Sequence, residues 1–289
     1  MKIAHTAAQV ERQPRAAALG TFDGVHRGHQ AVVNAVIETG LAATVVTFDP
    51  HPRVVVLGNR VEQICTLERR LELFGELGVE TTLVAGFTPE LMRLEPEEFA
   101  DSYLRTIGVE VVAAGEDFRF GAKRRGDLDL LEQLGFEVLT VPEVPGVSSS
   151  AIRAALAAGD VVTAAGLLGR PYELDGLVVA GDQRGGTLGY PTANLAVDLH
   201  LICPLYGIYA GEALDHRAAV SIGTNPHYGG TERRIEPYLL DYSGDLYGRR
   251  LVVELWERLR DEAVFESEEA LIEQIGLDVD AARTAVRPV

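Results

Sequence analysis

The sequence predicts two fold classes in one chain: an α/β domain with a parallel sheet, followed by an antiparallel β-barrel or sandwich and a C-terminal helix. Its 289 residues suffice for about two domains. Up to residue 168, apolar strand-like runs alternate with segments of helical periodicity, which indicates a parallel sheet. From residue 169 onward, short apolar runs are separated by Gly, Pro and Asp turns, which indicates an antiparallel domain. We therefore expect domains at residues 1–168 and 169–289.

The composition favours small molecules as partners. The formal net charge of −17 argues against nucleic acid and against an anionic membrane, because the field of the protein would repel both. The sequence has no apolar run of the ~18 residues that a membrane span needs, and its N-terminus has no signal-peptide core. The two cysteines, Cys65 and Cys203, lack the spacing of metal ligands. We expect a cytoplasmic protein with reduced thiols, present as a monomer or weak homo-oligomer.

Residues 20–29 carry the strongest functional signal in the first half. They form a glycine-rich turn between an apolar strand-like run and a helical run. The first amides of a helix lack internal partners and attract phosphate, and Gly20 and Gly28 let the backbone approach a ligand closely. His26 and His29 lie three residues apart, so both imidazoles can share one helix face and stabilise charge in a transition state. A purely structural glycine turn is the alternative.

The His-x-Gly-His spacing of this turn is similar to the signature of the nucleotidyltransferase superfamily, whose members join a nucleoside monophosphate unit to a phosphorylated acceptor. A P-loop kinase fits poorly, because the Lys-Ser/Thr ending of the Walker pattern is absent here. Loops that follow parallel strands gather at one edge of the sheet, where we expect the site. Further strands are expected at residues 41–48, 81–85, 109–113 and 138–141, and helices at residues 66–77 and 96–107.

Two of the loops at this edge contain further candidates. His51 lies between two prolines in the loop after the second predicted strand, so its backbone is held extended. Residues 115–121 follow a later strand and contain Asp117 and Phe118. A tight loop that buries Phe118 and Phe120 in the core is the alternative for this stretch.

Residues 148–150 are three serines in front of an apolar helical run. A serine N-cap by itself explains them. The functional alternative adds the hydroxyls of Ser149 and Ser150 and the guanidinium of Arg153, which together suit a triphosphate at a helix N-terminus. The helical run extends over residues 152–168 with a predicted break at a Gly-Asp pair.

The second half contains a glycine-rich stretch, residues 181–194, with four glycines within nine positions. Amides of such a loop can wrap a phosphate, although a plain hairpin loop explains the glycines about as well. Thr192 and Asn194 supply hard oxygen ligands that suit Mg²⁺ beside nucleotide phosphates. Strands are expected at residues 174–180, 208–213, 218–222, 235–240 and 251–256, and a terminal helix at residues 268–275.

Glu236 falls inside an apolar run, between Ile235 and Leu239. In an alternating strand it is expected to share one face with Tyr238 and Leu240. A carboxylate there either faces solvent or acts as a general base that takes the proton from an attacking hydroxyl.

Together, these stretches resemble the bacterial bifunctional riboflavin kinase/FAD synthetase family over nearly the whole chain. The resemblance implies a Rossmann-like nucleotidyltransferase domain followed by an antiparallel six-stranded β-barrel with a C-terminal helix. It also implies two reactions. The γ-phosphate of ATP moves to the riboflavin 5′-hydroxyl to give FMN, and FMN then attacks the α-phosphate of a second ATP to give FAD and pyrophosphate. The motifs that carry the resemblance lie at residues 20–29, 47–52, 115–121, 149–153, 181–194, 221–226 and 245–248.

The resemblance implies a role for each candidate residue. Glu236 is the kinase base, and Thr192 and Asn194 bind Mg²⁺ and ATP. His26 and His29 stabilise the transition state of adenylyl transfer. The implied ATP and flavin contacts of the adenylyltransferase are Gly20, Phe22, Asp23, Gly28, His51, Asp117, Phe118, Ser149, Ser150 and Arg153. Those of the kinase are Gly181, Arg184, Gly189, Pro191, Thr192 and Asn194.

The chain departs from the family pattern at a few positions. Pro237 and Tyr238 follow Glu236 where the family usually has a small or β-branched residue and then often His. His227 and Ser150 each stand where the family usually has Thr. Because proline lacks the ladder donor, the strand is expected to lie at an edge or a bulge there. Two alternative functions stay open: an enzyme with only one of the two activities, and a flavin-binding or carrier protein.

Overall fold

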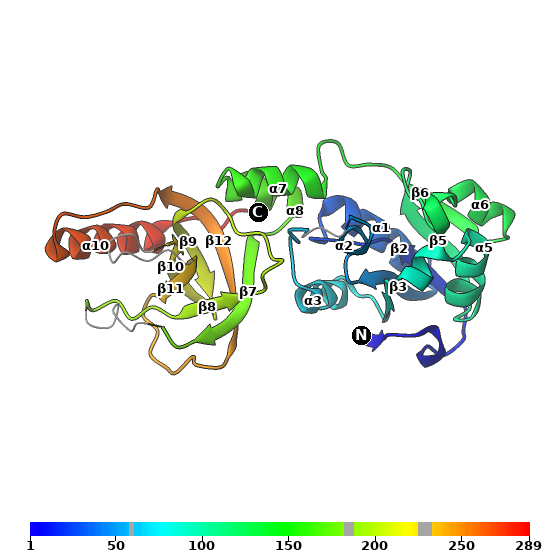
Figure 1. The fold of residues 1–289 in the computed structure, drawn as a ribbon, viewed down its shortest axis with the longest axis horizontal. Coiled ribbons are helices and arrows are strands. Elements are labelled where there is room, and N and C mark those ends of the chain that lie inside the picture. The colour runs from blue at the N-terminus through cyan, green and yellow to red at the C-terminus, as the bar shows by residue number, and fades with distance from the viewer. Residues whose placement is uncertain (58–60, 182–187, 225–232) are drawn as a thin grey trace. The chain divides into compact units, whose positions relative to one another are not determined.

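The computed structural model describes residues 1–57, 61–181, 188–224 and 233–289 (Figure 1). Two compact units are formed, one by residues 1–62 and 67–147 and the other by residues 63–66 and 148–289. Within the described residues, each unit contains a six-stranded sheet with its own buried apolar core. One sheet is parallel and the other antiparallel, which confirms the predicted fold classes.

The sheet of the first unit is parallel throughout and has the order β1-β4-β3-β2-β5-β6. β2 lies inside this sheet and is buried along its whole length, which accounts for its uninterrupted apolar sequence after Arg15. β1 has three residues and was not predicted, because so short a run shows no period. The strands are β1 (Lys2–Ala4), β2 (Arg15–Leu19), β3 (Ala42–Asp49), β4 (Thr81–Gly86), β5 (Val109–Gly115) and β6 (Glu137–Val141).

Helices cover both faces of this sheet. The side chains of β2 alternate between two cores, with Ala16 and Ala18 in one and Ala17 and Leu19 in the other. The first core includes residues of α1 (Arg27–Glu38) and α3 (Leu67–Leu77). The second includes residues of α5 (Pro96–Phe99), which continues as a π-helical segment over Ala100–Arg105, and of α6 (Leu128–Gln133). The short helices α2 (Pro52–Leu57) and α4 (Pro89–Arg93) lie in the connections.

The second unit contains a nearly closed antiparallel barrel with the strand order β11-β10-β9-β12-β7-β8. The two ends of the sheet meet where the Ala193 N–H donates to the Pro237 carbonyl at 2.9 Å. β8 was missed from the residue pattern, because its four residues follow the glycine-rich stretch. The strands are β7 (Tyr172–Val179), β8 (Asn194–Val197), β9 (Gly207–Ala213), β10 (His216–Gly223), β11 (Arg234–Leu239) and β12 (Arg250–Arg260).

Among the described residues, three helices accompany the barrel in the second unit. α7 (Ser149–Ala157) and α8 (Val161–Leu168) place Ile152, Leu156 and Leu168 in the core of the barrel. The predicted break between them is confirmed, and Asp160 caps α8 by accepting from the Thr163 N–H at 2.9 Å. α10 (Glu268–Thr284) lies on the outside of the barrel (Figure 1). Its Ala282 packs in one buried cluster with Trp256 of β12. Of the helices that the structure describes, none has the length and apolar character that a membrane span requires.

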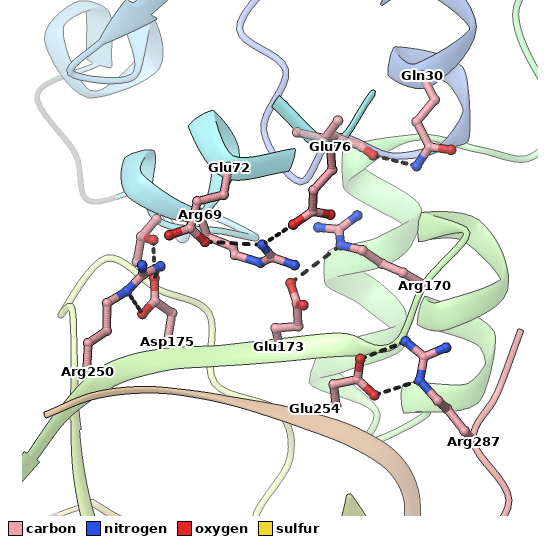
Figure 2. A network of polar contacts seen from close by, with 12 residues as sticks. Gln30, Arg69, Glu72, Glu76, Arg170, Glu173, Asp175, Arg250, Glu254 and Arg287 are labelled. Atoms are coloured by element: carbon pink, nitrogen blue, oxygen red, sulfur yellow. Dashed lines mark hydrogen bonds and ion pairs between the residues drawn. The ribbon is translucent and has the colours of Figure 1, made fainter. Parts of the chain in front are cut away.

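Residues 63–66 lie far from the barrel in sequence but pack as part of it. The Gln63 N–H donates to the His200 carbonyl at 2.6 Å, and Ile64, only 1% exposed, joins the barrel core. The Thr66 hydroxyl donates to Asp175 at 2.6 Å, and the same carboxylate accepts two bonds from Arg250 at 2.7 and 2.8 Å (Figure 2). The first half of the chain therefore supplies the barrel with a core side chain, Ile64, and with hydrogen bonds from Gln63 and Thr66.

Candidate active sites

The two candidate histidines of the first unit, His26 and His29, form one cluster at the start of α1. His26 is the N-cap residue, 7% exposed, and its Nδ1 accepts from the backbone N–H of His29 at 3.2 Å. Because Nδ1 accepts, the proton of a neutral His26 ring is on Nε2. The two rings stack with centroids 3.5 Å apart. The cap bond and the stack hold both imidazoles beside the amide groups that begin the helix.

His29 lies in an environment that disfavours its charged form. Burial lowers the pKa of His29 well below 6.5, and the nearby His26 and Arg70 lower it further. The edge of Phe22 packs against the ring, with centroids 5.3 Å apart. Nδ1 of His29 is buried and has no hydrogen-bond partner within the described part of the chain. At neutral pH the ring is therefore a neutral imidazole that keeps one N–H donor.

The turn before α1 is tight at both of its candidate glycines. A Cβ atom on Gly20 would lie 3.1 Å from the Phe22 ring, and one on Gly28 would lie 3.3 Å from the His26 ring. Phe22 itself has a φ of 54°, which a bulky residue rarely adopts, and Asp23 is buried. Strained backbone of this kind is maintained only by the surrounding structure and is common in ligand-binding turns. Gly20, Phe22 and Asp23 thus lie in the turn itself, and Gly28 lies in the first turn of α1.

The loops after β3 and β5 lie at the same edge of the sheet as this turn, because these strands flank β2 in parallel. In the first loop, His51 is buried and its Nδ1 accepts from the Arg53 N–H at 3.1 Å. In the second, Asp117 is exposed. Phe118 is half-buried and stacks on Phe120, which is buried in the core. The core-filling alternative is therefore correct for Phe120, while Phe118 lies at the border of the core.

Ser148, rather than the two candidate serines, makes the cap bond of α7. Its Oγ accepts from the Ala151 N–H at 3.1 Å, and Ser149 and Ser150 form the first turn of the helix with Arg153 following. The cap therefore explains one serine of the three. These residues pack with the second unit and are described within it.

Arg70 belongs to the first site and was missed by sequence reasoning. It extends from α3, is 3% exposed, and donates to the Thr21 carbonyl at 2.6 Å and weakly to the Phe48 carbonyl at 3.5 Å. The hydroxyl of Thr47 donates to the same Thr21 carbonyl at 3.1 Å. A signal was available, since Arg70 stands three and four residues before buried Leu73 and Phe74 and so lies on the apolar face of its helix.

In the second unit, Glu236 lies on the outward-facing side of β11. Ile235, Pro237 and Leu239 point into the barrel, whereas Glu236 and Tyr238 lie on the other face, as predicted. Glu236 pairs in register with Ser221 of β10, and the Arg234 guanidinium lies 3.9 Å from its carboxylate. The prediction that Leu240 shares this face was wrong. β11 ends at Leu239, so the alternation stops there and Leu240 is buried.

Pro237 is accommodated because β11 is the last strand of the sheet, which confirms the predicted edge position. It stands opposite Val220 in the register, and its carbonyl accepts from Ala193, on the side away from β10. Since the N and the carbonyl of one strand residue point to the same side, the missing N–H removes no bond to β10. The same contact brings the strand of Glu236 next to residues 191–194.

The glycine-rich stretch and β11 meet through side chains as well. A Cβ atom on Gly181 would lie 2.2 Å from the amide of Asn194, so the two residues are in direct contact. Tyr190 packs edge-on against Tyr238, with ring centroids 5.5 Å apart. The neighbouring candidates are Gly189, with a φ of 87°, Pro191, which is exposed, and Thr192, which is half-buried. Arg184 and the family departure His227 lie outside the described residues.

The donors available for a metal are oxygen atoms. Within the described ranges, no group of three or more His, Cys, Asp or Glu side chains is placed to hold a metal ion. Thr192 and Asn194 can offer a hydroxyl and an amide oxygen, and Asn194 is held against Gly181. Mg²⁺ prefers oxygen ligands, usually keeps several waters, and is often bound by few protein groups together with substrate phosphates. This donor set therefore fits Mg²⁺ carried by ATP better than a closed protein cage.

Comparison with known proteins decides the family. Residues 8–154 match the family model for FAD synthetase, and residues 168–286 match the one for riboflavin kinase. A bifunctional riboflavin kinase/FMN adenylyltransferase from Listeria monocytogenes is 37% identical, with 92% of this chain and 90% of the relative covered. The enzyme of that name from Escherichia coli K12 is 35% identical, with 96% and 95% covered.

The chain belongs to the bifunctional riboflavin kinase/FMN adenylyltransferase family. It is accordingly an ATP-dependent transferase of FAD synthesis with both activities, which excludes the single-activity and carrier alternatives. A crystal structure from Streptococcus pneumoniae, described as a macrolide-efflux protein, has the same fold. It superposes with a TM-score of 0.87 at 29% identity, covering 98% of this chain and 99% of that one.

Proposed function

We propose that the two reactions of this bifunctional enzyme use the two sites described above. Adenylyl transfer takes place at the His26–His29 pair, and phosphoryl transfer takes place beside Glu236. The observation that carries the proposal is the bond from the His29 N–H to Nδ1 of His26, which leaves an N–H donor on Nε2 of His26 at a helix N-terminus. The module limits that we propose are residues 1–168 and 169–289, supported by family matches at 8–154 and 168–286.

In adenylyl transfer, an oxygen of the FMN phosphate attacks the α-phosphorus of ATP and pyrophosphate leaves. Charge on the phosphate oxygens is stabilised by the amide groups at the start of α1 and by N–H groups of His26 and His29. Neutral imidazoles suit this task, because they donate hydrogen bonds and need not lose a proton. The proposed contacts to ATP and FMN are Gly20, Phe22, Asp23, Gly28, His51, Asp117, Phe118, Ser149, Ser150 and Arg153.

In the kinase reaction, the carboxylate of Glu236 accepts the proton of the riboflavin 5′-hydroxyl as that oxygen attacks the γ-phosphorus of ATP. Thr192 and Asn194 hold Mg²⁺, which neutralises charge on the phosphates when bound. The contact between Gly181 and Asn194 positions that amide. The remaining proposed contacts are Arg184, Gly189 and Pro191. We also propose that the enzyme works in the cytoplasm as a monomer or weak homo-oligomer.

The test uses one chain and two assays: FMN formed from riboflavin and ATP, and FAD formed from added FMN and ATP. Glu236→Gln is expected to lower the kinase rate by about 10²–10⁴ and to leave FAD formation from FMN unchanged. His29→Gln is expected to do the reverse. Matched controls are Glu257→Gln, at an exposed position of β12, and His5→Gln, at an exposed position near the N-terminus, which are expected to change neither rate. Equal loss of both activities in either site variant contradicts two separate sites.

A further inference from the structure

We propose that Arg70 is a positioning residue for adenylyl transfer. It holds the turn at residues 20–26 in place through a hydrogen bond to the Thr21 carbonyl. Its buried positive charge attracts the phosphates of the bound substrate. The inference rests on the proposed use of the His26–His29 pair and concerns a residue in a different element, α3. Arg70 acts through the turn and is not argued to touch the reacting atoms.

The contacts of Arg70 converge on the backbone of the site loops. Its bond to the Thr21 carbonyl is short, at 2.6 Å, and a charged donor makes such a bond stronger than a neutral one. Thr21 directly precedes Phe22, whose φ of 54° is unfavourable for its side chain. A second, longer contact reaches the carbonyl of Phe48 at the end of β3. One guanidinium therefore links the strained start of the turn to the end of β3.

Within the described part of the chain, Arg70 bonds to carbonyl groups and forms no ion pair. The side chain is only 3% exposed. Its hydrogen bonds go to carbonyl groups, and Nε has no hydrogen-bond partner among the described residues. A buried cation that bonds only to neutral groups is costly to desolvate. The charge is close enough to His29 to lower the pKa of that ring. An anion bound at the N-terminus of α1 lies in the field of this charge, which favours phosphate over water there.

The same unit supplies a matched control. Arg15, at the start of β2, is also 3% exposed and donates to Thr44 and Thr81 at 3.2 and 3.3 Å and to the Glu11 carbonyl at 2.9 Å. It lies at the amino end of the sheet, opposite the candidate site. The two arginines have equal burial and similar bonding but differ in their distance along the strands from the histidine pair. If Arg70 had only a structural role, replacing either arginine would lower stability and leave the rate of adenylyl transfer in the folded enzyme unchanged.

The experiment compares Arg70→Met with Arg15→Met in the full chain. FAD formation from added FMN is measured at a temperature at which calorimetry shows each variant folded, and kcat and the KM for ATP are determined separately. We expect Arg70→Met to lower kcat by about 10- to 100-fold and to raise the KM for ATP, as expected for loss of a charge-assisted hydrogen bond. We expect Arg15→Met to lower the melting temperature without changing either constant. Kinase activity of each preparation is expected to stay at the wild-type level.

Equal kinetic constants in the two folded variants would overturn the proposal. If Arg70→Met does not fold, Arg70→Lys and Arg15→Lys decide it. Lysine keeps the charge but presents a single nitrogen, so Arg70→Lys is expected to keep the KM for ATP and to lower kcat several-fold, with Arg15→Lys unchanged. Unchanged kcat in Arg70→Lys would equally overturn it. Wild-type enzyme without FAD formation would instead contradict the adenylyltransferase activity itself.

Discussion

The backbone N–H of His29 donates to the ring of His26 at 3.2 Å, and the two imidazoles stack 3.5 Å apart. The His26 side chain thus caps the N-terminus of α1 and also stacks against the ring of His29. His26 thus combines the observed capping role with the catalytic role that we propose, and substitutions can separate the two.

His26→Asn is expected to preserve the helix and to abolish most adenylyl transfer. Asparagine is among the best N-cap residues, so the free energy of unfolding is expected to stay near the wild-type value. Its amide cannot stack on His29 as an imidazole does, and loss of one oxyanion donor costs about 10²–10³ in rate. His26→Ala is expected to lose the same rate and also ~1 kcal/mol of stability. Denaturant unfolding and FAD formation from FMN measure the two effects, and equal stability of the two variants would contradict the capping role.

The stability of the first unit is expected to fall with decreasing pH because of His29. Its pKa in the folded state lies well below 6.5, so as pH drops below that value the unfolded chain binds the proton first. The contribution of the neutral ring is fully present above the unfolded pKa and is lost as pH falls through the folded pKa. Urea unfolding at about pH 7.5 and about pH 5.5 is expected to show a larger loss for the wild type than for His29→Gln. Parallel losses would show that His29 does not titrate in this way.

Gly181→Ala is expected to reduce kinase activity through Asn194. The added Cβ would lie 2.2 Å from the Asn194 amide, so that side chain must move. In an Asn194→Ala background the same change meets no amide, and Gly181→Ala is expected to have little further effect. A double-mutant cycle on kcat/KM for ATP in the kinase assay measures this coupling. The same fold-loss in both backgrounds would mean that Gly181 acts independently of Asn194.

Ile64→Ala is expected to destabilise the kinase barrel, although Ile64 precedes the barrel strands by more than a hundred residues. The side chain is 1% exposed within the barrel core, and truncating such a residue costs ~2–5 kcal/mol. Thermal inactivation of the kinase activity is therefore expected at a lower temperature, with a smaller change for adenylyl transfer. Ile3→Ala, at an exposed position, is the control. Inactivation of adenylyl transfer first would contradict the packing of residues 63–66 with the barrel.

Much of the fold could be predicted because it depends on patterns of residues that are close together in the sequence. The apolar runs that became β2, β3, β4 and β5, the break between α7 and α8, and the spacing of His26 and His29 are visible within a few residues of one another. The gathering of three loops at one edge followed from parallel alternation alone. The candidate residues of both sites could be named for the same reason, since each lies in a short motif. Their catalytic roles stay predictions.

Other features depend on contacts between segments far apart in the chain, which no local pattern encodes. Arg70 reaches Thr21 across 49 residues, and Ile64 enters a core built from residues after 148. The bond from Ala193 to the Pro237 carbonyl joins the two ends of the sheet and shows that this carbonyl faces away from β10. The sequence by itself determined the two fold classes, the order of elements and the reactive motifs. Only the tertiary structure decided which side chains pack against those motifs or hydrogen-bond to them, because burial and long-range hydrogen bonds form only when distant segments of the chain come together.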